Sequence, residues 1–579
     1  MSAAGGEMRR LSDKGHHPHF AAANDRIYYD EDARPAKEAE PAHFLVSVDS
    51  NGKDRRVHAH SNYARQIEVS PGAQWLAFRE NFHVYVVPMP PGADLDLSLK
   101  TSAVPLRRAS DIGGDYLNWN GPDTLTWTVG PTLYRAGVAD LFAPGATDKH
   151  GGKLTDLGTT RAADKPSGTV ALTGARIVTM NGSDQVIENG VIVVRDNRIV
   201  AVGPADSVQI PANARRLDVS GRTIIPGLID IHAHGQQGED DLVPQQNYIA
   251  LAHLAMGVTT VHDPSNRASE VFAAAEYQRI GSILAPRIFS TGDVVYGAHS
   301  EGFASIETLE DARNHVARLK AQGAISIKNY IQPRREQRQM VVTAAREAGM
   351  MVVAEGGALY QLDMALISDG NTGLEHNLPP QHFYDDVLQF WPKTGVSYTP
   401  TLVVTFGGLG AENYFYQDSE VWTHPILSRL VPPQVLQPRS VRRPMAPSSD
   451  YQPIRDSAAN AKQLMERGVL VNIGAHGQRE GLGSHWEMRS FVLGGMTPLQ
   501  ALHAATINPA RHMGLANDIG SLETGKLADM VIVDGNPVQD ISVTDRIVYV
   551  VQNGRIYEGG TLTETLTGQR KVAPLYWWK

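Results

Sequence analysis

The sequence of 579 residues contains no cysteine. Disulfide bonds and thiolate metal ligands are therefore excluded, and a bound metal must be held by histidine, a carboxylate or a modified lysine. Long apolar runs are also missing, so we expect no membrane span. The first residues, MSAAGGEMRRLSDKG, lack the apolar core of a signal peptide. We expect a soluble chain without a signal peptide, and its compartment stays open.

The excess of acidic over basic residues is also small. Lys and Arg number 53 against 62 Asp and Glu, and the two signs are mixed along the chain. A net charge of -9 at this length argues against an extended surface for nucleic acid or anionic membranes. We therefore expect a small-molecule partner and no nucleic acid. The length predicts two or three domains.

The first segment, residues 1–165, alternates short apolar runs with Gly, Pro, Asn and Asp, which predicts an all-β domain. Three phrases look like copies of one unit, PHFAAANDRIYYD, IEVSPGAQWLAFR and LNWNGPDTLTWTV, beginning at Pro18, Ile67 and Leu117. A spacing of about 50 residues fits four strands per unit. The phrases resemble the TolB-like (PD40) propeller repeat, which implies a partial β-propeller.

Three blades cannot close a propeller ring. The missing blades are therefore expected from a partner chain, from a homo-oligomer or from a removed upstream region. The alternative is an open, partial propeller that packs on the next domain.

Two further β segments, residues 166–224 and 513–579, flank a long insert and predict one composite β-sandwich. Hairpin turns are expected at Asn181-Gly182, Asn189-Gly190 and Asp196-Asn197. Between the two segments, residues 225–512 alternate eight short apolar strands with amphipathic helical segments. This alternation predicts a parallel (β/α)8 TIM-type barrel of the α/β class, with its chemistry at the carboxyl ends of the strands.

The stretch IIPGLIDIHAHG ends the first barrel strand with His232 and His234. Residues two apart on a strand point to the same face, so both imidazoles are expected at the barrel mouth, holding one cation. A pair of core histidines satisfied by the backbone is the alternative. Ligand-type residues that end later strands favour the metal site: Lys328 on the fourth strand, Glu355 on the fifth, His376 on the sixth and His476 on the eighth.

Such a cluster predicts a hydrolytic centre with one or two divalent ions, and zinc is the expected metal. A bound ion lowers the pKa of water to about 7 and polarises a carbonyl. His262 or Asp263 ends the second strand and is equally open to a site role and a structural role. His485 and Glu487 are candidates for fixing the tautomer of a ligand.

The phrases PGLIDIHAHG, GVTTVHD, TPLQALHAATINPARHMG and GSLETGKLADMVIVDGNP resemble the amidohydrolase superfamily, most nearly its imidazolonepropionase-like and prolidase-like branch, over roughly residues 168 to 560. The resemblance implies a metal-bearing barrel with a composite β-sandwich. It also implies that the HxH pair, a carbamylated lysine on strand four and histidines on strands five and six hold the metal, with an aspartate on strand eight as general base. The matching residues are His232, His234, Lys328 and His376.

Two positions depart from that pattern. Glu355 stands where a histidine is expected, and His476 stands where the aspartate is expected. The exchange keeps a similar set of ligands but leaves the number of ions and the general base open. We count both residues among the metal ligands and expect one of them to transfer the proton. Glu355 paired with Lys328, in a site without carbamate, is the alternative.

Two other features belong to the expected site. Tyr330, two residues after Lys328, is a candidate donor to a developing oxyanion. A loop of nearly 50 residues after the seventh strand carries Arg439, Arg442 and Arg443. We interpret it as a lid or a propeller interface whose arginines can bind a substrate carboxylate, with a solvated loop as the alternative.

The leading functional hypothesis is a metal-dependent hydrolase that cleaves a carbon–nitrogen bond in an amide, N-acyl amino acid, dipeptide or cyclic amide. An esterase, lactonase or phosphotriesterase with the same centre is the first alternative. A catalytically impaired binding or scaffold protein is the second, because Glu355 and His476 depart from the family pattern. Propeller-fused relatives are often exported by bacteria, so the periplasm is slightly favoured over the cytoplasm.

Overall fold

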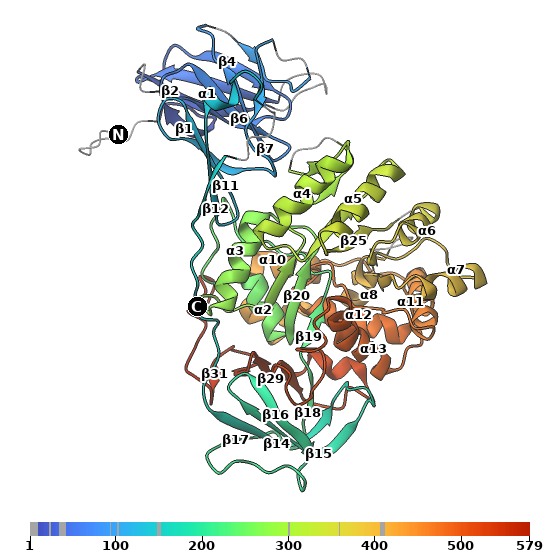
Figure 1. Cartoon of the computed structure of the whole chain (residues 1–579). Helices are drawn as coiled ribbons and strands as arrows, with labels where there is room; N and C mark the ends of the chain where they lie inside the picture. The colour runs from blue at the N-terminus through green and yellow to red at the C-terminus, as the bar shows by residue number, and fades with distance from the viewer. Residues whose placement is uncertain are drawn as a thin grey trace. The chain divides into compact units, whose positions relative to one another are not determined.

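The computed structural model describes residues 10–21, 25–33, 42–92, 94–100, 103–146, 152–298, 302–357, 359–405 and 411–578. The chain forms two compact units, shown in Figure 1. Unit 1 contains Met1–Thr160 and Val295–Gly323, and unit 2 contains Arg161–Val294 and Ala324–Lys579. Among the described residues, no helix combines the length and the apolar character that crossing a membrane requires.

Unit 1 is rich in strands, which form three sheets, each built mainly from consecutive strands (Figure 1). The first sheet contains β1 (His16–Phe20), β2 (Arg26–Asp32), β3 (His43–Asp49), β4 (Arg56–Ser61) and β8 (Leu95–Asp96). The second contains β5 (Arg65–Val69), β6 (Trp75–Glu80), β7 (His83–Pro88) and β9 (Arg107–Arg108). The third contains β10 (Asp115–Trp119), β11 (Thr124–Val129), β12 (Thr132–Gly137) and β13 (Lys153–Asp156).

All three sheets begin with the same irregularity. The register between the first two strands shifts directly after His16, Arg65 and Asp115, which are about 50 residues apart. The residue that follows each of them is left-handed, with φ of 51° at His17, 50° at Gln66 and 53° at Tyr116. The three-copy pattern of the sequence is therefore present in the backbone as three sheets with one shared bulge.

The segment Val295–Gly323 clusters with the N-terminal strands. It contains β22 (Val295–Tyr296), β23 (Ala304–Ser305) and α4 (Leu309–Gln322). The side chain of Asn81 accepts a hydrogen bond from Ser305 N (2.8 Å) and donates one to Ser305 O (2.9 Å). The guanidinium of Arg318 on α4 lies 3.8 Å from the centre of the Phe82 ring. These polar and cation–π contacts fasten the segment inside unit 1.

In unit 2, strands from both ends of the long insert form one sheet. Its order is β16-β15-β14-β18-β28-β29-β30-β31, and β17 also pairs with β14. The two segments meet where β18 runs antiparallel to β28, with Ile224 opposite Ile532. The strands are β14 (Thr169–Val178), β15 (Val186–Arg195), β16 (Arg198–Pro204), β17 (Arg215–Asp218), β18 (Thr223–Pro226), β28 (Met530–Val533), β29 (Ile547–Gln552), β30 (Arg555–Glu558) and β31 (Glu564–Thr565).

The predicted turn at Asn189-Gly190 is wrong, because β15 runs through these residues. Gly190 pairs with Ala175 on one side and with Pro204 on the other. A Cβ added at Gly190 would overlap the side chain of Ile177. The glycine therefore serves close packing between strands and not a reversal of the chain. The turn at Asp196-Asn197 is present, between β15 and β16.

Parallel strands and helices alternate through the rest of unit 2. The parallel strands are β19 (Leu228–Asp230), β20 (Val258–Asp263), β21 (Arg287–Ser290), β24 (Ser326–Tyr330), β25 (Met351–Glu355), β26 (Gly373–Glu375) and β27 (Ser397–Thr399). The helices beside them are α2 (Tyr248–Ala255), α3 (Ala268–Arg279), α5 (Arg335–Glu347), α6 (Tyr360–Ser368), α7 (Asp385–Phe390), α11 (Gln452–Met465), α12 (Leu482–Leu493), α13 (Pro498–Ala505) and α14 (Ile507–His512).

The parallel strands form two sheets, one with the order β19-β20-β21 and a second that includes β24-β25-β26-β27. Together they curl, so that the segment from Val471 to Ile473 lies between β27 and β19. Val471 forms a parallel bridge with Tyr398 of β27, in place of a regular eighth strand. On the other side, the backbone N of Ile231, just after β19, lies 3.4 Å from Ile473 O. The curl brings the carboxyl ends of β19, β25 and β26 toward one rim.

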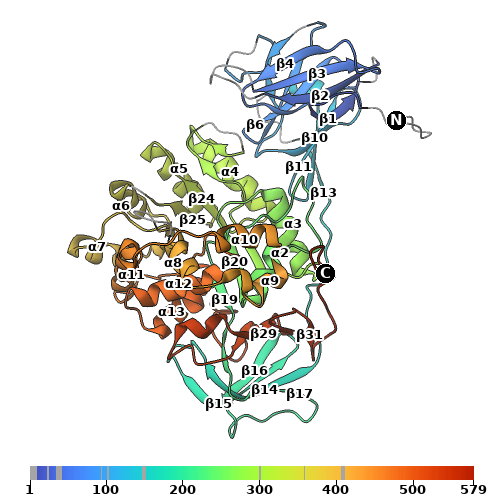
Figure 2. The same cartoon turned by 180° about the vertical axis from the view of Figure 1, so that it is seen from behind.

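The long segment after β27 is largely helical and not an open loop. It contains α8 (Glu412–Gln417), α9 (Leu427–Leu430) and α10 (Pro433–Val441). As Figure 2 shows from behind, α9 lies close to α2 and α8 lies close to α12. Phe415 of α8 stacks on Trp486 of α12, with ring centroids 5.3 Å apart. Aromatic packing therefore orders most of the segment that was expected to act as a lid.

We expect that Asp164→Ala destabilises unit 2. Both carboxylate oxygens of Asp164 bind Arg555, at 2.7 and 2.8 Å, and the two side chains are only 20% and 14% exposed. The substitution removes one of the two acidic partners of the half-buried Arg555 guanidinium. We expect the free energy of unfolding to fall by about 2–4 kcal/mol. Urea titration followed by tryptophan fluorescence measures the change in free energy of unfolding.

Glu188→Ala is the matched control, because Glu188 also binds an arginine through both oxygens but is 69% exposed. Its loss should cost about 1 kcal/mol or less. An equal decrease in the free energy of unfolding for the two variants would contradict the role given to Asp164.

Candidate metal centre

A buried carboxylate fixes the backbone around the HxH pair. Asp230 ends β19 and accepts hydrogen bonds from the backbone N of His232 (3.1 Å) and of Ala475 (3.2 Å). It also accepts one from Ser484 Oγ, at 2.7 Å. The backbone N of His476 donates to His232 O at 2.6 Å. Backbone and carboxylate hydrogen bonds thus connect the segment after β19 to the segment around His476, independently of any contact between imidazoles.

A carboxylate holds Nδ1 of each imidazole of the pair. His232 Nδ1 lies 2.5 Å from Glu375 Oε2, and His234 Nδ1 lies 2.9 Å from Asp263 Oδ1. Both carboxylates are buried. Burial raises the pKa of Glu375 to about 8, whereas a hydrogen bond from His232 Nδ1 favours its ionised form. With both acids ionised, the ring protons lie on Nδ1, and the two Nε2 lone pairs, 3.0 Å apart, are directed toward each other. Facing lone pairs repel unless a cation lies between them.

His376 and His476 complete a cluster of four imidazoles. The His476 ring centroid lies 5.1 Å from that of His232 and 4.8 Å from that of His234. The His376 ring lies 5.0 Å from His232 and 5.3 Å from His476. The ligand atoms of His232, His234 and His476 all lie within 4.8 Å of one another. The curled sheet therefore brings together histidines separated by up to 244 residues in the chain.

Both of these later histidines have strained backbones. The φ angle is 71° at His376 and 57° at His476, in the left-handed region that favours glycine. Thr401, whose Oγ1 lies 2.8 Å from His376 Nδ1, also has a positive φ of 45°. Such conformations cost about 1–3 kcal/mol each and gather at functional sites.

Glu355 links His376 to Lys328. Its Oε1 lies 3.0 Å from His376 Nε2 and its Oε2 lies 2.5 Å from Lys328 Nζ. The lysine is 1% exposed. Burial alone would raise the pKa of Glu355, but the ammonium of Lys328 and the hydrogen bond with His376 hold that pKa well below its ordinary value. Glu355 is therefore an ionised carboxylate inside the cluster.

At His232 and His476 the electrostatics favour the neutral imidazole, which is the form that binds metals. Burial lowers the pKa of His476 to about 3, and the neighbouring histidines act in the same direction. Burial, followed by the charge of Lys328, also holds the pKa of His232 well below its ordinary value. The donor types, their tautomers and their protonation thus fit a divalent cation.

Three predicted candidates have structural partners instead. His262 uses Nδ1 on Ile231 O (3.1 Å) and Nε2 on Ser326 Oγ (2.7 Å). His485 uses Nδ1 on Thr544 Oγ1 (2.9 Å) and Nε2 on Met256 O (2.8 Å). Glu487 accepts a hydrogen bond from the backbone N of Val403 at 2.6 Å. Both ring nitrogens of His262 are used, which favours its structural role, and both of His485 are used on Thr544 and Met256 and not on a histidine of the cluster.

Other predicted residues lie near the ends of the parallel strands. Tyr330 is the last residue of β24 and is half-buried. Arg439 lies 2.9 Å, through Nη1, from Oε1 of Gln478, two residues after His476, whereas Arg442 is exposed. Among the contacts of the described residues, only Arg439 of the three loop arginines contacts a residue near the histidine cluster.

The roles of Glu375 and Asp230 did not follow from sequence periodicity. Glu375 and His376 are neighbours, and strand alternation would place them on opposite faces. The φ of 71° at His376 breaks this alternation, so both residues reach the cluster. The available signal was an acidic residue inside an apolar strand, in TGLEHNL and in GLIDIHAH. A buried charge of that kind needs a partner.

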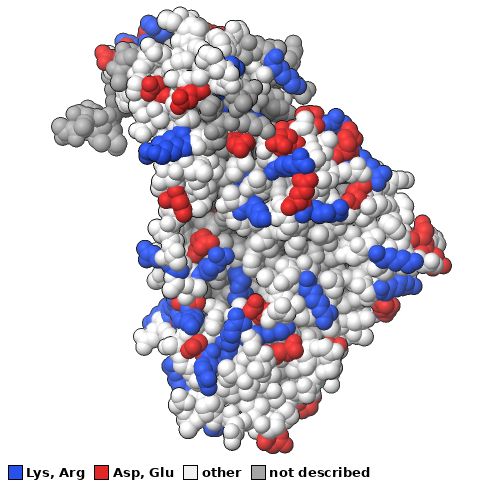
Figure 3. Space-filling view, in the orientation of Figure 1, with Lys and Arg blue, Asp and Glu red and all other residues white. Residues whose placement is uncertain are grey.

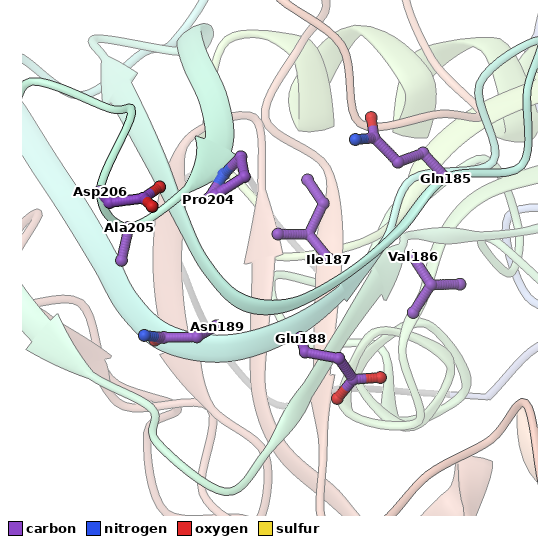
Figure 4. A pocket seen from close by; sticks show the side chains of 8 residues that line it. All are labelled: Gln185, Val186, Ile187, Glu188, Asn189, Pro204, Ala205 and Asp206. Atoms are coloured by element: carbon purple, nitrogen blue, oxygen red, sulfur yellow. The ribbon is translucent and has the colours of Figure 1, made fainter.

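Larger cavities are lined by other parts of unit 2. One of about 370 Å³ is lined by residues of β15, of the end of β16 and of their flanks, among them Glu188 and Asp206 (Figure 4). Another, of about 280 Å³, is lined partly by Arg279, Arg287 and Arg555. A pocket beside His234 measures about 10 Å³. The histidine side chains themselves are closely packed.

Comparisons with known proteins identify the family of the chain. Residues 223–557 match the family model described as Amidohydrolase family. The chain is 28% identical over 374 residues to the imidazolonepropionase of Erwinia tasmaniensis, covering 58% of this chain and 84% of that protein. It is 37% identical over 122 residues to the imidazolonepropionase of Shouchella clausii, covering 19% of this chain and 27% of that protein. A solved Xaa-Pro dipeptidase with bound methionine shares the fold, with TM-score 0.52, 21% identity and coverage of 68% of this chain and 100% of that chain.

Gly477→Ala is expected to disturb the cluster. Gly477 has φ of 71°, and a Cβ there would overlap the carbonyl oxygen of His234. The added methyl must displace the HxH segment, so we expect zinc affinity to fall by at least about tenfold, since ligand placement is exacting. Gly514→Ala is the control, because Gly514 has φ of 72° with open space around it. Equal zinc affinity in both variants, measured by competition with a chromophoric chelator, would contradict the packing described.

Glu375→Gln tests the carboxylate behind His232. The amide keeps the shape of the side chain but removes the charge that fixes the proton on His232 Nδ1. Loss of such a partner typically weakens metal binding about 10- to 100-fold. Asp363→Asn is the control, since Asp363 is a buried acid that accepts from Gly357 N. The idea fails if isothermal titration gives the two variants the same zinc affinity.

Proposed function

Because the chain belongs to the amidohydrolase family and is a hydrolase that acts on carbon–nitrogen bonds, we propose that it uses a divalent metal to cleave an amide, an N-acyl amino acid, a dipeptide or a cyclic amide. One observation carries the proposal: the Nε2 atoms of His232 and His234 approach to 3.0 Å while a carboxylate holds each Nδ1. A cation between these nitrogens removes the repulsion of their lone pairs.

The proposed ligands of one ion are His232, His234 and His476, whose donor atoms lie within 4.8 Å of one another. Zinc is the proposed metal, because three imidazoles with a fourth position left for water are a common ligand set of catalytic zinc. When bound, such an ion lowers the pKa of water to about 7 and polarises a carbonyl.

Lys328, Glu355 and His376 form the other side of the proposed centre. Carbamylation of Lys328 would turn its ammonium into an anion, and with Glu355 and His376 it would provide ligands for a second ion. The ion pair of Lys328 with Glu355, at 2.5 Å, supports the simpler arrangement in which the lysine is unmodified. In that arrangement one ion is expected.

We assign the proton transfer to Glu355. Its pKa is held low by Lys328 and His376, so it is ionised at neutral pH, and its side chain is 14% exposed. A carboxylate in this position accepts a proton from the attacking water and delivers it to the leaving nitrogen. His476 is the second candidate, although a residue that ligates the metal is less free to carry a proton. Tyr330 is proposed to donate to the oxyanion.

The proposed substrate is a small molecule with an amide-type bond. On the face shown in Figure 3, acidic and basic side chains are interspersed and no large area carries one sign, which favours a small partner over a polyanion. Arg439, close to the segment that carries His476, is the proposed partner for a substrate carboxylate.

At the level of the fold, we propose that the curled parallel sheet is a (β/α)8 barrel and that the three sheets of unit 1 are blades of a partial TolB-like propeller. The bridge at Val471 supports the first proposal, and the repeated bulge at His17, Gln66 and Tyr116 supports the second. A propeller of three blades leaves open edges, so we also propose a homo-oligomer or a partner chain that covers them.

Removal of the metal and loss of one ligand test the proposed function. Dialysis against a chelator should abolish hydrolysis of a panel of N-acyl amino acids and Xaa-Pro dipeptides, and zinc should restore it. His234→Ala should lower kcat/KM by about 10³-fold or more, because the water loses its activating ion. Matched esters in the same panel separate amide from ester cleavage.

His503→Ala is the control for the loss of an imidazole, since His503 pairs with Asp184 and lies outside the cluster. It should keep activity close to that of the unchanged chain. Activity that survives both chelation and His234→Ala would overturn the proposal.

A further inference from the structure

A second group of metal-ligand side chains lies in unit 1, on β1 and β2. It contains His16, His17 and Asp30, whose donor atoms all lie within 4.8 Å of one another. His16 Nδ1 is 3.0 Å from His17 Nδ1, and His17 Nδ1 is 3.4 Å from Asp30 Oδ2. Around a tetrahedral zinc with bonds of about 2.0–2.1 Å, neighbouring ligand atoms are about 3.3 Å apart. The observed separations match that edge.

Adjacent residues of a strand normally point to opposite faces. Here the bulge between His16 and His19, with φ of 51° at His17, breaks the alternation. Both imidazoles consequently lie close to Asp30, which is the residue of β2 directly across from His16.

The other two sheets show that the bulge alone does not make a site. Their corresponding pairs are Arg65-Gln66 and Asp115-Tyr116, with the same left-handed backbone. In the first sheet alone, among the three described bulges, two imidazoles occupy these positions and an acid lies opposite. The repeat supplies the geometry, and the first copy supplies the ligands.

The side chain of Asp30 gives independent evidence that a cation can bind here. It is 3% exposed, and its Oδ1 has no hydrogen-bond partner among the described residues. Its Oδ2 accepts from the backbone N of Ile67 at 3.2 Å. A buried carboxylate with an unsatisfied oxygen is costly, and a cation satisfies it.

Further carboxylate contacts lie behind His16. Its Nε2 is 3.1 Å from Asp32 Oδ2, and the other oxygen of Asp32 is 2.7 Å from His43 Nδ1. An acid on the far nitrogen of an imidazole is the usual support for a metal ligand. It is also the arrangement found for His232 and His234 in unit 2.

We propose that His16, His17 and Asp30 form a second site for a divalent transition metal of the zinc class. Two imidazoles and one carboxylate suit zinc, nickel or copper more than calcium or magnesium. Three protein ligands leave one position for water or for a further ligand. Arg79 is a nearby positive charge, but it is paired with Asp115 at 2.5 Å, which offsets its repulsion of a cation.

Zinc titration of the full chain, in competition with a chromophoric chelator, tests the site. The unchanged chain should bind one more equivalent of zinc than His17→Ala and one more than His16→Ala. His60→Ala is the control, since His60 is a partly exposed histidine on the same sheet that pairs with Asp94. It should bind as the unchanged chain does. Equal zinc binding by all four proteins would overturn the proposal.

A second measurement uses the unchanged chain and is independent of how the variants fold. The side chains of His16 and His17 are 45% and 55% exposed, so diethylpyrocarbonate should modify them in metal-free protein. Zinc should slow both reactions at least fivefold, as mapped by peptide mass spectrometry, and leave His60 unchanged. The proposal is wrong if His16 and His17 react at the same rate with and without saturating zinc.

Discussion

The candidate metal centre depends on two buried carboxylates that form hydrogen bonds with Nδ1 of His232 and His234. Glu375 on His232 and Asp263 on His234 fix the ring protons on Nδ1, which turns both Nε2 lone pairs to a common point. Asp230 fixes the backbone that carries the pair and ties it to the segment of His476. Each of these acids is buried and is tolerable only because it is paired. Without them the packed rings would lose the groups that select the Nδ1-protonated tautomer, and the two Nε2 lone pairs would no longer be directed to one point.

The exchange at two strand ends also has a physical reading. Glu355 has taken the place where the resemblance implies a histidine, and it contacts both Lys328 and His376. His476 has taken the place of an acid and joins the HxH pair. Compared with the pattern that the resemblance implies, the carboxylate lies beside Lys328 and His376 and the imidazole lies beside the HxH pair, while the number of donors stays the same. This arrangement is compatible with the proposed centre, in which imidazoles hold the ion and Glu355 transfers the proton.

Backbone strain has a similar use in both units. At His376, directly after β26, a positive φ turns a side chain that strand alternation would direct elsewhere, and His476 has a positive φ in a turn. At His17 the same device acts inside a repeated bulge, so that neighbouring imidazoles converge. In each case a conformation that glycine would adopt without cost is occupied by histidine. The energetic cost is consistent with a functional benefit, because nothing in local propensity favours it.

The sequence by itself determined the alternation of strands and helices, the three-copy pattern of unit 1 and the HxH pair, because these depend on periodicity and local residue type. It also indicated His376, His476, Glu355 and Lys328, which were expected at strand ends. In the structure Glu355 ends β25 and His376 directly follows β26, but Lys328 lies in the middle of β24 and His476 lies in a turn beyond the bridge at Val471. Only the tertiary structure decided that Glu375 and Asp230 support the pair, that His262 and His485 are used elsewhere, and that Asn189-Gly190 continues a strand. Those outcomes depend on which distant groups meet, and on φ angles that periodicity does not predict.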